Sequence, residues 1–176
     1  TTDKDCYNFF KKLLPYVGNT IVGIQNAKEY LGVGISSNNM LKLYKKLPNF
    51  RVIKGEAPSV IIQKEIAKYP SDLKVFNGRG GKEIIDNFSV GCKGIVPALD
   101  YADKLINIYK HLQNKDNEKA NKEYVKVLPN IVFVMQFINT LVLGDSVVRT
   151  APVGLYGFVG YQTIYWGQLS ASVLYY

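Results

Sequence analysis

Apolar residues recur along the chain in two patterns that alternate with each other. Short runs rich in apolar residues have the length of buried strands and cover residues 20–24, 50–54, 73–76 and 95–96. The stretches around them carry apolar residues at helical spacing and predict helices over residues 3–16, 36–47, 60–69 and 84–90. Such alternation is typical of βα units built around a parallel sheet.

The same patterns divide the chain into three predicted segments. Residues 1–100 hold the βα units, and residues 101–141 predict two further helices. Residues 142–176 form an apolar tail rich in glycine and tyrosine. Three interpretations of this tail remain open: a packed irregular or β extension, a surface for protein contacts, and an artefactual reading frame.

Candidate functional residues follow the predicted strands, because parallel βα folds build their sites from the loops at the carboxyl ends of the strands. These positions hold Gln25 and Asn26, Lys54 and Glu56, Asn77, Gly78 and Arg79, and Pro97.

Lys54 is the position with the clearest chemical interpretation. It follows Val52 and Ile53 directly and precedes a glycine. An apolar wall disfavours the charged form of a lysine and lowers its pKa, which yields the free amine that attacks a ketone to form a Schiff base. A surface lysine at the end of a strand fits the same position, so position alone leaves both interpretations open.

The other strand ends each allow two interpretations. Glu56 either transfers protons near an imine or places a negative charge at the N-terminus of the following helix, where it interacts favourably with the helix dipole. The segment Asn77–Gly81 is expected to be a strand-to-helix turn, and its glycines would let N–H groups meet an anion at a helix N-terminus, with Arg79 as a carboxylate partner. Gln25 and Asn26 supply neutral hydrogen-bonding groups that cannot act as acid or base.

Together these segments resemble the dihydrodipicolinate synthase/N-acetylneuraminate lyase family of Schiff-base (β/α)₈ barrels. The resemblance spans most of residues 1–140 and rests on IVGIQNA, LYKKLPNFRVIKGEA, DLKVFNGRGG and GCKGIVPA, which occur in the family's order. It implies an α/β fold, a partial (β/α)₈ TIM barrel made of the last four βα units and the C-terminal helices. It also implies that Lys54 forms the imine. Because half of a barrel exposes two sheet edges and half of its core, we expect this chain alone to be inactive, and poorly stable unless it dimerises or is completed by the other half.

Two departures from the family pattern narrow the expected chemistry. Gln25 stands where the family usually has a proton-relaying tyrosine. The triplet Lys54-Gly55-Glu56 and the segment Asn77–Gly81 look more like the branch resembling 2-keto-3-deoxy-L-arabonate dehydratase. The resemblance thus implies a dehydratase or aldolase acting on a 2-keto-3-deoxy sugar acid. The alternatives are pyruvate condensation of the dihydrodipicolinate synthase type and a non-catalytic truncated barrel.

Composition argues against several other classes of protein. The 176 residues are 47% hydrophobic, which is enough for a core, yet no run of about 18 uncharged apolar residues appears. The first residues resemble no signal peptide, so we expect a cytoplasmic protein without a membrane partner. The net charge of +8 is spread over lysines interleaved with acidic residues, and we expect no nucleic-acid partner.

Metal and cofactor chemistry is also unexpected. His111 is the only histidine, which excludes a His-based triad within the chain, and Cys6 and Cys92 lie too far apart for zinc-ligand spacing. We expect both cysteines to be reduced and buried, and we expect no metal and no cofactor. The expected partner is the small-molecule 2-oxo acid, and the family resemblance implies a homo-oligomer, a dimer or tetramer, in the full-length form.

Overall fold

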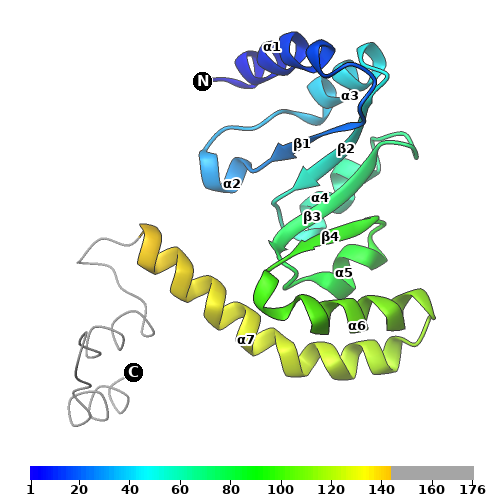
Figure 1. The fold of residues 1–176 in the computed structure, drawn as a ribbon, viewed down its shortest axis with the longest axis vertical. Coiled ribbons are helices and arrows are strands. Elements are labelled where there is room, and N and C mark those ends of the chain that lie inside the picture. The colour runs from blue at the N-terminus through cyan, green and yellow to red at the C-terminus, as the bar shows by residue number, and fades with distance from the viewer. Residues whose placement is uncertain (144–176) are drawn as a thin grey trace. The chain divides into compact units, whose positions relative to one another are not determined.

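The centre of the fold is a parallel sheet whose four strands follow one another in chain order. The structure, a computed structural model, describes residues 1–143, with side chains as far as residue 135. The strands, shown in Figure 1, are β1 (Val22–Asn26), β2 (Phe50–Gly55), β3 (Lys74–Gly80) and β4 (Gly94–Pro97). Each strand pairs in parallel with the next, which confirms the predicted βα organisation.

Helices connect these strands and continue after the last of them. They are α1 (Asp3–Leu13) with the short 3₁₀ helix η1 (Leu14–Val17), α2 (Lys28–Leu31), α3 (Ser37–Lys46), α4 (Ser59–Ile66), α5 (Ile84–Ser89), η2 (Leu99–Tyr101), α6 (Ala102–Gln113) and α7 (Asn117–Leu143). Residues 1–126 form one compact unit, and the described residues from Val127 onward belong to a second unit. The first unit holds the whole sheet, and the boundary falls within α7.

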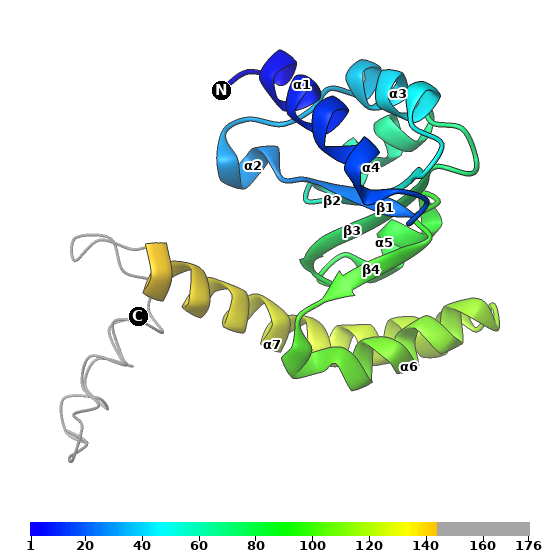
Figure 2. The same cartoon turned by 45° about the horizontal axis from the view of Figure 1, so that its top comes forward.

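One face of the sheet packs against the helices, as the turned view in Figure 2 shows. Ile24 of β1, Ile53 of β2 and Val75 of β3 pair in register and are buried in one cluster with Met40 and Leu43 of α3. Burying side chains of this size stabilises the fold by about 1.5–3 kcal/mol each. Side chains alternate along a strand, so the residues that follow these three point to the opposite face.

That opposite face carries the candidate lysine. Gln25 pairs in register with Lys54, and Lys54 pairs with Phe76, so the three side chains form a row across β1, β2 and β3. The structure therefore separates an apolar helix-covered face from a face on which the polar residues Gln25 and Lys54 lie side by side near the carboxyl end of the sheet.

The local boundaries differ from the sequence prediction at three places. Asn77–Gly81 is not a turn that opens a helix, because β3 continues to Gly80 and α5 begins only at Ile84. The buried Asn77 side chain finds hydrogen-bond partners inside the protein, which allows the strand to extend past it. The expected loop after β1 contains the short helix α2, and β1 begins at Val22 rather than Thr20.

The later segments agree with the predicted elements. The two helices expected within residues 101–141 are α6 and α7. No helix within residues 1–143 is both long and apolar enough to cross a membrane. Apart from the end of α7, the predicted tail 142–176 lies outside the described residues.

Candidate functional site

An ion pair between Lys54 and Glu56 occupies the carboxyl end of β2. The distance from Lys54 Nζ to Glu56 Oε1 is 2.7 Å. The Lys54 side chain is 30% exposed and that of Glu56 only 9%, so the amine is open to a ligand while the carboxylate is almost covered. The sequence led us to expect an apolar wall around Lys54. In the structure a carboxylate, that of Glu56, also lies directly beside its amine.

Glu56 is fixed by the neighbouring strand. Its Oε2 accepts a hydrogen bond of 3.0 Å from the main-chain N–H of Arg79. Gly78 leaves the necessary space: a β-carbon built there would lie 2.2 Å from Glu56 Oε1 and 2.3 Å from Oε2. Both oxygens of Glu56 are therefore engaged within the site, one by the amine and one by the backbone of β3.

Gln25 and Asn26 take different positions at the end of β1. Gln25 is exposed and lies in register with Lys54, where its amide can meet a ligand bound to the amine. Asn26 is committed within the protein, because its side chain donates to the Ile35 carbonyl and accepts from the Ile35 N–H, both at 3.0 Å. Asn26 thus closes the loop that carries α2.

Asn77 is likewise engaged within the protein. It is fully buried, and its amide nitrogen donates 2.9 Å hydrogen bonds to the Ala57 carbonyl and to Asn87 Oδ1. These contacts tie the start of the segment after β2 to β3 and α5. In this structure Asn77 supports the Lys54–Glu56 segment from behind and presents no exposed group to a substrate.

The Arg79 side chain also has partners within the protein. Its Nη1 lies 2.6 Å from Glu29 Oε2 of α2 and its Nε lies 3.1 Å from Glu83 Oε2. The second contact is an ion pair without hydrogen-bond alignment, since neither Nε nor that oxygen has a hydrogen-bond partner. The sequence did not single out Glu29 or Glu83; the spacing of Glu83 four residues after Arg79 is the one signal that could have suggested its role.

Pro97 ends β4 and is half-buried beside Gly80, with which it pairs in register. It lines an apolar cavity of about 320 Å³ with residues of β3, β4, α5 and α6. Its predicted role in substrate binding has no polar contact to support it here and stays a prediction.

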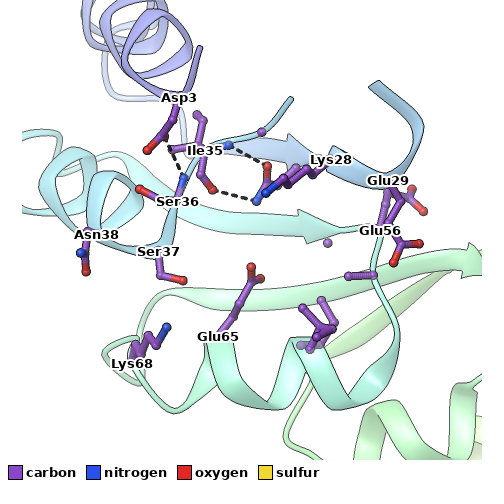
Figure 3. Close-up of a pocket in the computed structure, with 16 residues that line it drawn as sticks. Asp3, Lys28, Glu29, Ile35, Ser36, Ser37, Asn38, Glu56, Glu65 and Lys68 are labelled. Carbon is purple, nitrogen blue, oxygen red and sulfur yellow. Dashed lines mark hydrogen bonds between the residues drawn. The ribbon is translucent and has the colours of Figure 1, made fainter. Parts of the chain in front are cut away.

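A larger cavity of about 660 Å³ adjoins the site on the side of α3 and α4. In Figure 3, Glu65 projects from α4 and Lys68 from the segment that follows α4, both on the side of Ser36 and Ser37 at the start of α3. Glu29 and Glu56 lie together at the other end of the cavity. Burial raises the pKa of Glu65 above its ordinary value. The residues that line this cavity include Glu56 but not Lys54.

The cysteines and metal-ligating residues add no further centre to the part of the chain described. Cys92 is buried and Cys6 half-buried, both with free thiols, and burial raises the pKa of the Cys92 thiol to about 11. Within residues 1–143 no three His, Cys, Asp or Glu side chains come together in an arrangement that could hold a metal ion.

Two curated proteins are similar to the chain in sequence. The 4-hydroxy-tetrahydrodipicolinate synthase of Caldicellulosiruptor saccharolyticus is 28% identical over 148 residues, which are 83% of this chain and 49% of the relative. The enzyme of the same name from Caldicellulosiruptor bescii is 26% identical over the same shares. No family model matches the chain. The chain spans about half the length of the curated relatives it matches.

Solved structures show the same fold at low sequence identity. A protein described as a dihydrodipicolinate synthetase from Pseudomonas aeruginosa superposes with a TM-score of 0.70 at 18% identity, covering 89% of this chain and 52% of that one. The sialic acid aldolase of Ruminococcus gnavus superposes with a TM-score of 0.67 at 16% identity, and the match covers 82% of this chain and 52% of the aldolase. The 2-keto 3-deoxygluconate aldolase of Picrophilus torridus superposes with a TM-score of 0.65 at 14% identity, and the match covers 99% of this chain and 55% of the aldolase.

These findings confirm the expected fold class, part of a (β/α)₈ barrel. The names of the relatives, together with the structural neighbours, support the dihydrodipicolinate synthase/N-acetylneuraminate lyase family. The 2-keto-3-deoxy-L-arabonate dehydratase branch stays a prediction.

Proposed function

We propose that the chain is part of a lyase that acts on a 2-oxo acid through a Schiff base, with Lys54 as the residue that forms the imine. The observation that carries this proposal is the 2.7 Å contact between Lys54 Nζ and Glu56 Oε1 at the carboxyl end of β2. It places a proton acceptor against an amine that is partly open to a ligand. The names of the curated relatives and the shared fold of the two aldolases support it.

The proposed reaction begins with proton transfer from the Lys54 ammonium to Glu56, which leaves a nucleophilic amine. The amine attacks the C2 carbonyl carbon of the 2-oxo acid. The carbonyl oxygen takes up protons and leaves as water, and a positively charged iminium joins Nζ to C2. This iminium withdraws electrons from the bonds around C3.

Two outcomes can follow from the iminium. Loss of a C3 proton gives an enamine, which expels a hydroxyl from C4 as water. Alternatively, the C4 hydroxyl gives up its proton to a base, the electron pair of the C3–C4 bond moves toward the iminium, and the C4 fragment leaves as an aldehyde. The enamine that remains takes up a proton at C3 and becomes an iminium again. Water then releases the product from Lys54 in either case.

We propose a 2-keto-3-deoxy sugar acid as the substrate class. Gln25 is exposed in the same row as Lys54, and its amide can hydrogen-bond a sugar hydroxyl but cannot carry a proton. Proton transfer in the proposed site therefore falls to Glu56. The second candidate is condensation of pyruvate with an aldehyde, which the names of the two curated relatives favour.

Borohydride reduction of the full-length protein in the presence of 2-oxo acids tests the central step. The expected result is a covalent adduct that appears with a 2-oxo acid and disappears in Lys54→Ala. Lys93→Ala is the matched control, because Lys93 is an exposed lysine that precedes β4 at the other end of the sheet. An adduct that persists in Lys54→Ala would contradict the proposal.

Product analysis separates the substrate classes. With a 2-keto-3-deoxy sugar acid we expect a dehydrated product or an aldehyde fragment. Consumption of pyruvate that depends on an added aldehyde, without turnover of the sugar acid, would favour the second candidate.

We further propose that turnover needs strands beyond those described. The outer edges of β1 and β4 have no strand partners within residues 1–143, and such edges pair readily with other strands. We expect residues 1–176 alone to be inactive and of low thermal stability, and the full-length protein to be a cytoplasmic homo-oligomer. Size-exclusion chromatography, thermal melting and cell fractionation test these points.

A further inference from the structure

Arg79 makes contacts in two directions at the end of β3. Its main-chain N–H binds Glu56, the partner of Lys54, at 3.0 Å. Its guanidinium, on a side chain only 14% exposed, lies between the carboxylates of Glu29 and Glu83. One residue thus connects the proposed proton acceptor with two acidic side chains.

The backbone of Arg79 is held in a conformation that L-residues rarely adopt. Its φ is 60°, and among the non-glycine residues of the described part only Lys115 also has a positive φ. The left-handed region disfavours a residue with a β-carbon and persists only where surrounding contacts enforce it. At Arg79 this conformation directs the N–H to Glu56, and the two ion pairs of the guanidinium are contacts that can enforce it.

The Glu29 pair also crosses the site. Glu29 belongs to α2, which follows β1, whereas Arg79 lies on β3, and β2 with Lys54 and Glu56 lies between these strands. A 2.6 Å contact from α2 to β3 therefore braces both sides of the β2 end.

We propose that Arg79 is a positioning residue for the Lys54–Glu56 pair, an inference that rests on the proposed function. The clamped guanidinium maintains the left-handed backbone, and that backbone holds the Glu56 carboxylate against the lysine amine. This differs from the sequence-based expectation that the guanidinium binds a substrate carboxylate, because Nη1 and Nε already face protein carboxylates.

Substitutions at residue 79 distinguish the two roles. Arg79→Gly removes the guanidinium but accepts φ of 60° without strain, whereas Arg79→Ala removes the guanidinium and disfavours that φ. Glu29→Gln weakens the clamp and leaves residue 79 unchanged. Glu56→Gln is the reference for loss of the carboxylate.

The experiment measures the rate at which pyruvate is trapped on Lys54 by borohydride in the full-length protein, across pyruvate concentration and pH. We expect Arg79→Ala to lower the maximal rate about tenfold, part of the effect of losing a positioned acid or base, with the half-saturating pyruvate concentration unchanged. Its pH profile should move toward that of Glu56→Gln. Arg79→Gly should stay within about threefold of the wild type, since glycine tolerates the left-handed conformation.

Two results would overturn the proposal. Equal increases of the half-saturating concentration in Arg79→Gly and Arg79→Ala would assign the guanidinium to the substrate carboxylate. A wild-type pH profile in Arg79→Ala would show that Arg79 does not act through Glu56. If Arg79→Ala fails to fold, Glu29→Gln replaces it in the comparison with the wild type. The expected result is then a smaller decrease of the maximal trapping rate, and an unchanged rate would overturn the proposal.

A second measurement keeps this inference separate from the proposed function. Carbon-13 NMR of the Glu56 carboxyl group in the ligand-free protein reports its titration directly. The positioning role predicts that the titration curve of Glu56 differs from that of the wild type in Arg79→Ala and stays close to it in Arg79→Gly. A wild-type curve in both variants would overturn the proposal. Absence of any pyruvate adduct in the wild type would instead refute the proposed function and leave this measurement to decide on Arg79.

Discussion

The carboxylate of Glu56 fills the space that a side chain at residue 78 would need. A β-carbon at Gly78 would lie 2.4 Å from the Glu56 carboxyl carbon, well inside contact distance. Gly78 does not have a positive φ, so the requirement for glycine comes from this contact and not from the backbone conformation. The geometry of the Lys54–Glu56 pair thus depends on a residue without a side chain on the adjacent strand.

Gly78→Ala should displace Glu56 from Lys54. We expect the free energy of unfolding to fall by about 1–3 kcal/mol, the typical cost of overpacking a filled site. Pyruvate trapping on Lys54 should slow at the same time. Urea unfolding and borohydride trapping measure the two effects. In the double variant Gly78→Ala/Glu56→Ala the clash is gone, so stability should return toward that of Glu56→Ala; additive losses would contradict the steric explanation.

Asn26→Ala should loosen the loop between β1 and α3. The substitution removes both hydrogen bonds to Ile35 at a partly buried site, and we expect a loss of about 1–3 kcal/mol in the free energy of unfolding. Asn49→Ala is the matched control, since Asn49 makes one exposed hydrogen bond to the Gly18 carbonyl. Equal losses in the two variants would show that the paired contact of Asn26 has no special weight.

The sequence predicted the order of the elements because strand and helix periodicities are local properties of the chain. It identified Lys54 and Glu56 as neighbours at a strand end, and their contact joins two residues that are close in sequence, Lys54 near the end of β2 and Glu56 directly after that strand. It missed the Arg79–Glu29 contact, which joins residues fifty positions apart through tertiary structure. It placed a turn at Asn77 because the buried partners of that side chain, Ala57 and Asn87, are not visible in a local pattern.

Alkaline pH should destabilise the fold through Cys92. Burial raises the pKa of its thiol from 9.0 to about 11 in the folded state. The unfolded chain therefore releases this proton at lower pH, so the stabilising effect is complete below about pH 9 and is lost as pH rises toward 11. Urea unfolding across this interval should show a decrease that is smaller in Cys92→Ala. An equal decrease in that variant would assign the effect to other groups, such as Tyr69, whose pKa burial raises to about 12.

Peptide mapping of the full-length protein after reduction with pyruvate and borohydride tests the central claim most directly. Lys54 differs from exposed lysines such as Lys119 because its side chain is only 30% exposed and its carboxylate partner, Glu56, is almost covered. The account predicts that the adduct lies on the peptide containing Lys54 and that Lys54→Ala abolishes it while Lys93→Ala does not. An adduct spread over surface lysines, or absent from the Lys54 peptide, would contradict the account.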